Sequence, residues 1–208
     1  MRATPKIVYL AGPEVFMPEC AAVIGQKEAL CRHYGFDPNS PSDNHIKTRI
    51  AETGSAFSIA IYTANVARIH ASDFGICDLT PFRGPSADTG TVFELGLLTG
   101  LGKPVFGYTN VTADYRDRIA LRQLTDLHGK PDPLPWPIWN DENGWIIENF
   151  ANADNLMIDS ALAVGGAGMV RHGPALASRF ADLGAFEACL KQAQQYFECA
   201  AALPPPAG

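Results

Sequence analysis

Hydrophobic positions along the chain fall into short apolar runs separated by segments with helical spacing. The runs at residues 6–12, 74–79 and 103–109 are rich in β-branched and aromatic residues and are typical of buried strands. Segments 18–34, 55–72, 90–102, 155–163 and 186–201 repeat apolar residues every three or four positions and predict helices. This alternation predicts βαβ crossovers, and therefore a parallel sheet in an α/β domain.

Other segments lack this periodicity. Residues 36–44, "FDPNSPSDN", predict a turn, and the Gly-rich residues 164–178 predict a flexible turn rather than a phosphate loop, because no preceding strand is evident. Residues 111–150 are rich in Pro, Asp and Trp and predict an irregular insertion, or lid, with a short helix at 115–124. Its Trp136, Trp139 and Trp145 either stack on a base or anchor the loop, and anchoring is favoured.

Length and composition favour a single domain. A chain of 208 residues, 47% of them hydrophobic and 18% charged, can bury one sizeable core, here expected over residues 1–203 with a disordered tail at 204–208. The net charge of -6 argues against binding to nucleic acid polymers, which requires a basic face. The apolar run at the start of the chain is too short for a signal peptide, and no apolar stretch is long enough to span a membrane. A cytoplasmic location is therefore expected.

The cysteines and histidines show no metal-ligand spacing. Five cysteines lie among apolar residues and are expected to be reduced thiols of the core: Cys20, Cys31, Cys77, Cys189 and Cys199. The five histidines are likewise scattered. No metal and no other cofactor is therefore expected.

Three carboxylates, Asp78, Asp88 and Glu94, concentrate the candidate chemistry. Ligands of open parallel sheets gather beyond the carboxyl ends of the strands, where Asp78, Tyr9 and Tyr108 are expected. Two residues six positions apart on one helix point about 120° away from each other. Asp88 and Glu94 can therefore face one pocket only if Asp88 precedes the helix or caps its start.

Glu94 is flanked by Phe93 and Leu95, so it borders apolar surface and needs a hydrogen bond or a proton. The hydroxyl of Tyr9 is a suitable partner. A shielded carboxylate beside a phenol suits nucleophilic attack on an anomeric carbon, and a second acid can protonate the leaving group.

Structural roles compete with this interpretation. Asp88 is a good N-cap by residue type, and Glu94 by itself is more often a solvated helix residue. Asp78 could cap its strand or pair with Arg83.

Three motifs change this balance: "YLAGPEVF" at 9–16, "DLTPFRGPSADTGTVFELG" at 78–96 and "NLMID" at 155–159. Together they resemble the nucleoside 2-deoxyribosyltransferase family, most closely its purine-handling members, which share "PFRG". The resemblance covers residues 6–110 and a short block near 155. It implies a flavodoxin-like five-stranded parallel sheet and a ping-pong exchange of 2-deoxyribose between nucleobases, with no metal involved.

The resemblance also implies a role for each matching residue. Glu94 is the nucleophile that attacks C1 of the sugar, and Tyr9 orients it. Asp78 exchanges a proton with the nucleobase, and Asp88 accepts hydrogen bonds from sugar hydroxyls. Further substrate-binding positions implied by the motifs are Gly12, Pro13, Phe16, Phe82, Arg83 and Gly90.

In the family, an Asn and a Met of a neighbouring subunit complete the pocket. The matching residues are Asn155 and Met157, so the resemblance implies a homo-oligomer. Relatives that hydrolyse deoxynucleoside 5′-monophosphates carry a small hydroxyl residue six positions before the nucleophile, where this chain has Asp88. A carboxylate there repels a phosphate dianion, so unphosphorylated nucleosides are the expected substrates.

Insertions at 111–150 and 164–178 depart from the compact family pattern and leave three functions open. The first is transfer of deoxyribose between bases. The second is hydrolysis of a nucleoside, including a 2′-modified one, in which water replaces the acceptor base. The third is a nucleoside-binding module without turnover.

Overall fold

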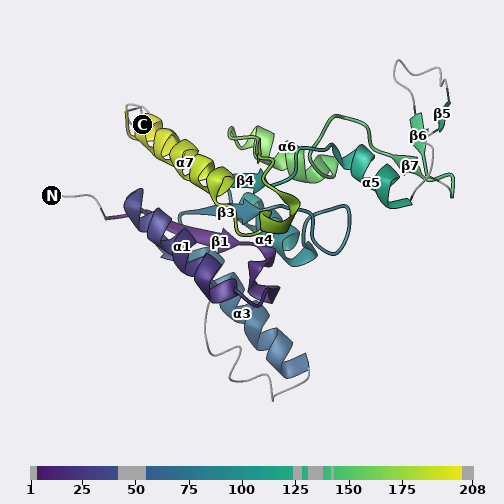
Figure 1. The fold of residues 1–208 in the computed structure, drawn as a ribbon. Coiled ribbons are helices and arrows are strands. Elements are labelled where there is room, and N and C mark those ends of the chain that lie inside the picture. Colours follow the sequence, from purple (N-terminus) through teal and green to yellow (C-terminus); the bar gives the residue numbers. More distant parts are fainter. Residues whose placement is uncertain (1–3, 42–54, 124–127, 131–137, 142, 203–208) are drawn as a thin grey trace.

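A parallel five-stranded sheet forms the centre of the molecule (Figure 1). The computed structural model describes residues 4–41, 55–123, 128–130, 138–141 and 143–202. The strands lie in the order β2-β1-β3-β4-β8, and all neighbouring pairs are parallel. Their bounds are β1 Ile7–Ala11, β2 Asp37–Asn39, β3 Phe74–Asp78, β4 Val105–Thr109 and β8 Met169–Arg171. The expected α/β class and the five-stranded parallel sheet are confirmed.

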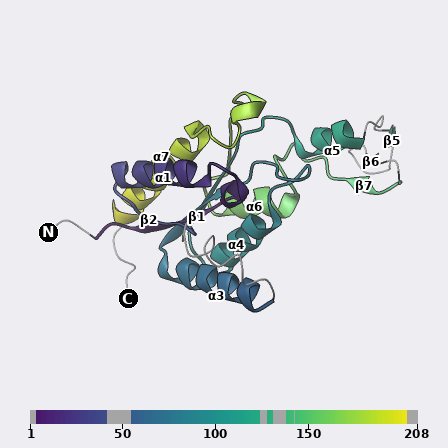
Figure 2. The same cartoon turned by 60° about the horizontal axis from the view of Figure 1, so that its bottom comes forward.

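Helices cover both faces of the sheet (Figure 2). One face packs against α1 (Cys20–His33) and α7 (Gly184–Ala202), and the other against α3 (Ser55–Ala71), α4 (Thr89–Gly100) and α6 (Leu156–Val164). The five predicted helices therefore exist, with ends within a few residues of the predicted ones. Two short 3-10 helices, η1 (Pro13–Phe16) and η2 (Leu176–Ser178), complete the main body.

Alternation along β1 divides the core into two clusters. Val8 and Leu10 pack with α1 and α7, whereas Tyr9 and Ala11 pack with α3, α4 and α6. This is the period-two pattern of a strand buried on both faces. Tyr9 was expected at the carboxyl end of its strand, and that expectation is wrong because it lies in the middle of β1, opposite Gly75.

Two edge strands were not predicted. The turn expected at 36–44 contains β2, and the flexible turn expected at 164–178 contains β8, preceded by a turn at Gly165 and Gly166. Each strand has only three residues, too few for a periodic pattern, and Pro38 in β2 is tolerated because an edge strand can lack one hydrogen-bond donor. Pairing with β1 or β4 therefore defines these strands.

The described residues between 115 and 147 form an arm that extends away from the main sheet (Figure 1). It contains the predicted short helix, α5 (Tyr115–Gln123), and an antiparallel sheet of β5 (His128–Lys130), β6 (Ile138–Asn140) and β7 (Ile146–Ile147). The irregular insertion is thus partly regular. The Arg116 guanidinium lies over the Trp139 ring, 5.0 Å from the centre of that ring. This contact agrees with Trp139 as an anchor of the loop. Trp145 is 72% exposed, so its side chain is not buried as that of an anchor would be, while Trp136 lies outside the described residues.

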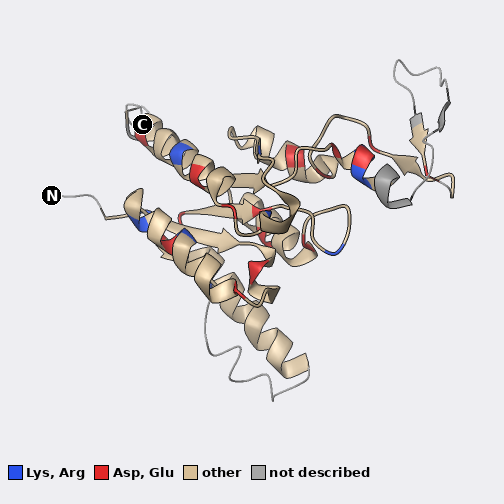
Figure 3. Ribbon diagram, viewed as in Figure 1, with Lys and Arg blue, Asp and Glu red and all other residues tan. Residues whose placement is uncertain are grey.

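The structure shows where the cysteines and the charged residues of the described chain lie. Four of the five cysteines are buried, but Cys199 is exposed on α7, so the expectation of a core thiol is wrong there. Lys and Arg lie on several separate elements of the described chain, including α1, α5 and α7 (Figure 3). Within the described ranges, no helix has the length and apolarity needed to cross a bilayer. The tail expected at 204–208 lies outside the described residues.

Candidate active site

Helix α4 begins at Thr89, so Asp88 precedes the helix and can face the same pocket as Glu94. Asp88 is the N-cap of α4, and its Oδ2 accepts hydrogen bonds from Thr91 N at 3.0 Å and Thr91 Oγ1 at 3.2 Å. This satisfies a backbone N–H that the first turn leaves without a helical partner. Glu94 then lies in the second turn, and the Asp88 charge contributes to its raised pKa. Capping and proximity to Glu94 are therefore compatible roles of Asp88.

Glu94 is a shielded carboxylate with two hydrogen-bond donors. The Tyr9 hydroxyl donates to Oε1 at 2.7 Å, and Asn65 Nδ2 donates to the same oxygen at 3.3 Å. Burial is the main cause that raises the pKa of Glu94 to about 7, against the lowering effect of the Tyr9 hydroxyl. Because both donors bind Oε1, the hydrogen bonds of the described residues leave Oε2 available for attack.

Tyr9 is suited to a permanent donor role. Its side chain is fully buried, and burial together with the nearby Glu94 raises the pKa of its hydroxyl well above the ordinary value. It therefore keeps its proton whether Glu94 is charged or neutral. The expectation that Tyr9 is the partner of Glu94 is met, even though Tyr9 reaches it from the middle of its strand. Asn65 was not expected, because a lone amide on a helix has no diagnostic spacing.

Asp78, the last residue of β3, is buried and holds two hydrogen bonds. Tyr108 Oη donates to Oδ2 at 2.9 Å, and Thr80 N donates to Oδ1 at 2.9 Å. Burial raises the pKa of Asp78 above its ordinary value. The alternative pairing with Arg83 is not found, because the Arg83 guanidinium lies over two aromatic rings instead.

A buried ion pair beside Asp78 was missed by the sequence analysis. Lys27 Nζ, from α1, donates to Glu14 Oε1, from η1, and lies 3.9 Å from Asp78 Oδ2. The side chains of Lys27 and Glu14 are 3% and 5% exposed. One pattern could have revealed Lys27: it falls on the apolar stripe of its helix, between Ile24 and Cys31.

The two candidate catalytic acids approach the carboxyl end of the sheet from opposite faces. Tyr9, the partner of Glu94, belongs to the core beneath α3 and α4, whereas Tyr108, the partner of Asp78, belongs to the core beneath α1 and α7. Among the described residues no hydrogen bond joins Asp78 to Glu94. The Glu14 charge contributes to the raised pKa of both. A substrate that contacts both Asp78 and Glu94 would have to lie across the carboxyl end of the sheet.

The "PFRG" loop presents an aromatic surface. The rings of Phe16 and Phe82 are stacked, with centroids 5.6 Å apart and 14° between their planes. The Arg83 guanidinium lies 4.9 Å from the ring centre of Phe16 and 4.7 Å from that of Phe82. The backbone of Arg83 has a φ of 56°, which non-glycine residues rarely adopt. Phe16 is 56% exposed, so this surface is accessible to a planar ligand.

The predicted glycines and proline lie around these groups. Gly12 follows β1, and a Cβ there would stand 2.0 Å from Glu14 Oε2, so no larger residue fits without moving that carboxylate. Pro13 is buried and begins η1. Gly90 lies in the first turn of α4, where a Cβ would stand 3.0 Å from Asp88 Oδ2.

Asn155 and Met157 lie at the start of α6. Asn155 is the N-cap: its Oδ1 accepts from Met157 N at 3.0 Å, and its Nδ2 donates to Glu148 Oε1 at 2.6 Å. Met157 is 71% exposed. Their structural roles within one chain are thus a helix cap and an exposed apolar side chain.

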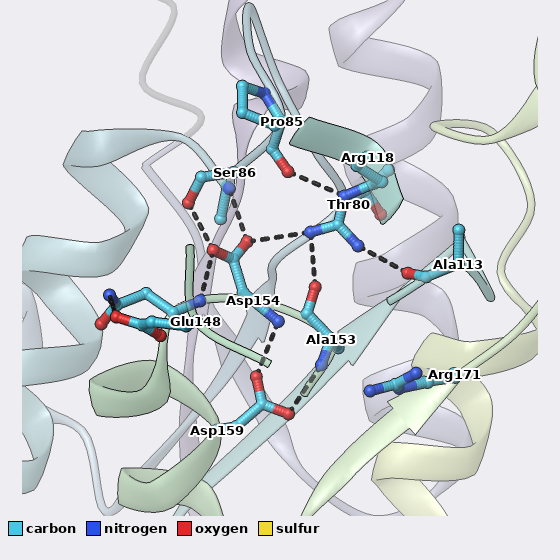
Figure 4. A network of polar contacts seen from close by, with 12 residues as sticks. Thr80, Pro85, Ser86, Ala113, Arg118, Glu148, Ala153, Asp154, Asp159 and Arg171 are labelled. Carbon is cyan, nitrogen blue, oxygen red and sulfur yellow. Dashed lines mark hydrogen bonds and ion pairs between the residues drawn. The ribbon is translucent and has the colours of Figure 1, made fainter. Parts of the chain in front are cut away.

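A polar network ties the 80–88 loop to the start of α6 (Figure 4). Asp154 accepts hydrogen bonds from Ser86 Oγ and, at 2.9 Å, from Ala87 N, and it lies 3.6 Å from Arg118 Nη2. Arg118 also donates to the Pro85 carbonyl at 2.7 Å. The loop that leads to Asp88 is therefore held by buried groups from two other elements.

The described residues contain no group of three or more His, Cys, Asp or Glu side chains arranged to hold a metal ion. What the site does contain is two carboxylates with raised pKa values, each hydrogen-bonded to a buried tyrosine. This arrangement can supply a nucleophile and a proton donor to one bound molecule.

Comparison with known proteins agrees with this arrangement. The family model described as nucleoside 2-deoxyribosyltransferase matches residues 8–157, which include Tyr9, Asp78, Asp88 and Glu94. The chain belongs to the nucleoside 2-deoxyribosyltransferase family. The match runs from β1 to the start of α6, so it also includes Asn155 and Met157.

Individual relatives of the family are distant. A 2-desoxiribosyltransferase from Leishmania mexicana has a similar structure, with a TM-score of 0.57 and 28% identity over 86% of this chain and 97% of that one. A conserved protein from Enterococcus faecalis shares the fold, with a TM-score of 0.50 and 21% identity over 91% and 99% of the two chains. An uncharacterised Schizosaccharomyces pombe protein is 31% identical over 113 residues. The chain spans about half the length of that curated relative, 54%.

Proposed function

We propose that this family member transfers 2-deoxyribose between nucleobases through a covalent intermediate on Glu94. The observation that carries the proposal is the state of Glu94: a carboxylate with a pKa raised to about 7, held through Oε1 by Tyr9, with Oε2 left for attack. Membership of the family supports the same chemistry.

In the first half-reaction, Glu94 Oε2 attacks C1′ of a deoxynucleoside. A C–O bond forms, the glycosidic C–N bond breaks, and its electron pair remains on the departing base. The base takes a proton from Asp78, whose raised pKa keeps a protonated fraction available. The result is a deoxyribosyl ester of Glu94, a free base and an ionised Asp78.

In the second half-reaction, a nitrogen of the incoming base attacks the same carbon. The ester C–O bond breaks, Glu94 regains its charge, and the proton of the incoming base returns to Asp78. Hydrolysis is the second candidate, because water can attack the same ester. The non-catalytic module is disfavoured, since binding alone does not require a shielded carboxylate with a free oxygen.

The other expected contacts belong to the same proposal. Asp88 Oδ1, which does not cap the helix, would accept a hydrogen bond from a sugar hydroxyl, and its charge would disfavour a 5′-phosphate. The base would lie against the Phe16 and Phe82 rings beside Arg83. Asn155 and Met157 would complete the pocket of a second copy, and the exposure of Met157 agrees with such a contact.

One incubation separates the candidate functions. The protein is mixed with deoxyinosine and free adenine, and the products are separated by chromatography. Deoxyadenosine is the expected product, whereas free deoxyribose as the sole sugar product would assign hydrolysis. Binding of deoxyinosine without any turnover would assign a binding module. A parallel series with pyrimidine donors tests the resemblance to purine-handling members.

The covalent intermediate has its own test. Wild-type protein is mixed with deoxyinosine alone, quenched in acid and weighed by intact-mass spectrometry. We expect one added deoxyribosyl group, located on residue 94 by peptide mapping. Glu94→Gln is the matched control, because it keeps the side-chain shape without the nucleophile. Turnover by Glu94→Gln at even a tenth of the wild-type rate would contradict the assignment.

A further inference from the structure

Lys27 lies buried among the groups that surround Asp78. Its ammonium donates to Glu14 Oε1, lies 3.9 Å from Asp78 Oδ2, and stands over the rings of Tyr108 and Phe186 at 5.5 Å and 5.4 Å. A lysine this deeply buried is costly unless it is paired, and the two carboxylates supply that pairing. Lys27 therefore holds a fixed charge within reach of the candidate acid.

Glu14 depends on Lys27 in turn. Its Oε2 is buried and has no hydrogen-bond partner in the described part of the chain, so the ammonium is the contact there that supports the Glu14 charge. Gly12 leaves the space that this carboxylate occupies. The pair thus has a defined position, fixed by η1 on one side and α1 on the other.

The remaining groups around Asp78 are neutral. Tyr108 donates to Asp78 from β4, Cys189 faces it from α7, and Cys77 is its neighbour on β3. Burial raises the pKa of all three well above their ordinary values, so none is charged at neutral pH. Among the described residues, the charges that act on Asp78 at close range are therefore those of Lys27 and Glu14.

We infer that Lys27 and Glu14 are positioning residues that set the proton affinity of Asp78, the acid that serves the nucleobase. The ammonium opposes the burial of Asp78 and favours its charged form, while Glu14 shares that ammonium and limits its effect. Without Glu14, Asp78 would be charged over a wider pH range and would protonate a departing base less readily. Without Lys27, it would be protonated over a wider pH range and would accept a proton from the incoming base less readily. This inference rests on the proposed function.

The test uses two variants that leave no unpaired buried charge. In Glu14→Gln, Lys27 faces Asp78 alone. In the double variant Lys27→Met with Glu14→Gln, both charges are gone and the side-chain volumes are kept. Lys6→Met is the matched control, because Lys6 pairs with Asp73 at the start of β1, away from the site. Circular dichroism verifies that each variant folds.

The readout is the titration of the Asp78 carboxyl by NMR, in protein with carbon-13 at the side-chain carboxyl of aspartate. The Asp78 signal is assigned by its loss in Asp78→Asn. We expect the midpoint to fall by about one pH unit in Glu14→Gln, since a charge within 4–6 Å shifts a pKa by such an amount. In the double variant the loss of the ammonium raises the midpoint and the loss of the Glu14 carboxylate lowers it, and because the ammonium has the larger effect we expect a smaller net rise. Lys6→Met should titrate as the wild type does.

The same variants, supplied with deoxyinosine and free adenine as the acceptor, are followed by release of hypoxanthine as a function of pH. Because release needs protonated Asp78, the alkaline limb of kcat/KM should move with the NMR midpoint. A loss of activity with unchanged midpoints would mean a merely structural pair and would overturn the inference. If the midpoints move as expected but no nucleoside loses its base, the effect on Asp78 stands and the proposed function fails.

Discussion

At the scale of single residues, the candidate site contains carboxylates in buried surroundings, where their charged forms are unfavourable. Glu94 is partly buried beside apolar residues, and its pKa is raised to about 7 because burial outweighs the Tyr9 hydrogen bond. An ionised carboxylate in such a place reacts readily but lowers the stability of the fold. The charge of Glu94 should therefore increase activity and decrease the stability of the fold.

Replacing Glu94 by Gln should stabilise the protein above neutral pH. In the folded state the pKa of Glu94 is about 7, against an ordinary 4.5, so the folded state binds the proton more tightly than the unfolded state. Wild-type stability should accordingly decline as pH rises from about 4.5 through about 7, by on the order of 3 kcal/mol in total. Glu94→Gln lacks this loss, so its melting temperature should exceed the wild-type value at pH ~8 and match it at pH ~4.

The measurement is thermal unfolding of both proteins across this pH range. A constant difference between the two melting temperatures at all pH values would show that the Glu94 charge is not the cause. Transfer activity of the wild type should change in the opposite sense, falling as pH drops through about 7, because the nucleophile must be ionised.

At the scale of elements, the loop from 80 to 88 is positioned by parts of the chain far away in sequence. Asp154, just before α6, and Arg118, on α5, hold the loop through Pro85, Ser86 and Ala87 (Figure 4). The side chains of Asp154 and Arg118 are 1% and 9% exposed, so their interaction is not weakened by solvent. The position of the Asp88 cap follows from this network.

Asp154→Ala should therefore destabilise the protein strongly. The change leaves Arg118 without its carboxylate and removes the acceptors of Ser86 and Ala87, a loss of about 3 kcal/mol or more in the free energy of unfolding. Denaturant unfolding measures this loss. Lys191→Ala is the control, since Lys191 forms an exposed pair with Glu187 on α7 and should cost about 0.5 kcal/mol or less. Equal losses in the two variants would contradict a structural role for the network.

At the scale of the whole molecule, large apolar side chains remain exposed over several elements. Ile59 and Tyr62 on α3, Phe93 on α4, and Met157 and Val164 on α6 are each at least 54% exposed. Patches of exposed apolar residues mark sites of association when they are contiguous. Of these residues, Met157 lies at the start of α6, and its exposure agrees with the proposal that a second copy covers that region.

Mixing inactive subunits tests whether Asn155 acts on a neighbouring pocket. Glu94→Ala lacks the nucleophile, and Asn155→Ser retains a capping oxygen for α6 but lacks the amide donor. If Asn155 completes the partner's site and subunits complete each other's sites in pairs, random exchange of subunits should restore about a quarter of the sites. Chromatography of the products follows the recovery. Absence of any recovery, with mixed dimers shown to form by native mass spectrometry, would place Asn155 in its own chain's site.

The sequence alone determined the repeating order of strands and helices, and the motif that contains Asp78, Asp88 and Glu94. It could do so because a residue buried on a strand or helix face leaves a local pattern, as at residues 6–12 and 90–102. The same local geometry required Asp88 to precede the helix or cap its start if it is to share a pocket with Glu94, and the structure shows that it is the cap.

Only the tertiary structure decided which distant groups meet. The edge strands β2 and β8 exist because β1 and β4 pair with them, and their three residues carry no pattern of their own. Lys27 and Glu14 meet Asp78, and Asn65 meets Glu94, across elements far apart in the chain. Such contacts depend on how the helices pack on the sheet, and the free energy of a buried charge depends on all its neighbours at once.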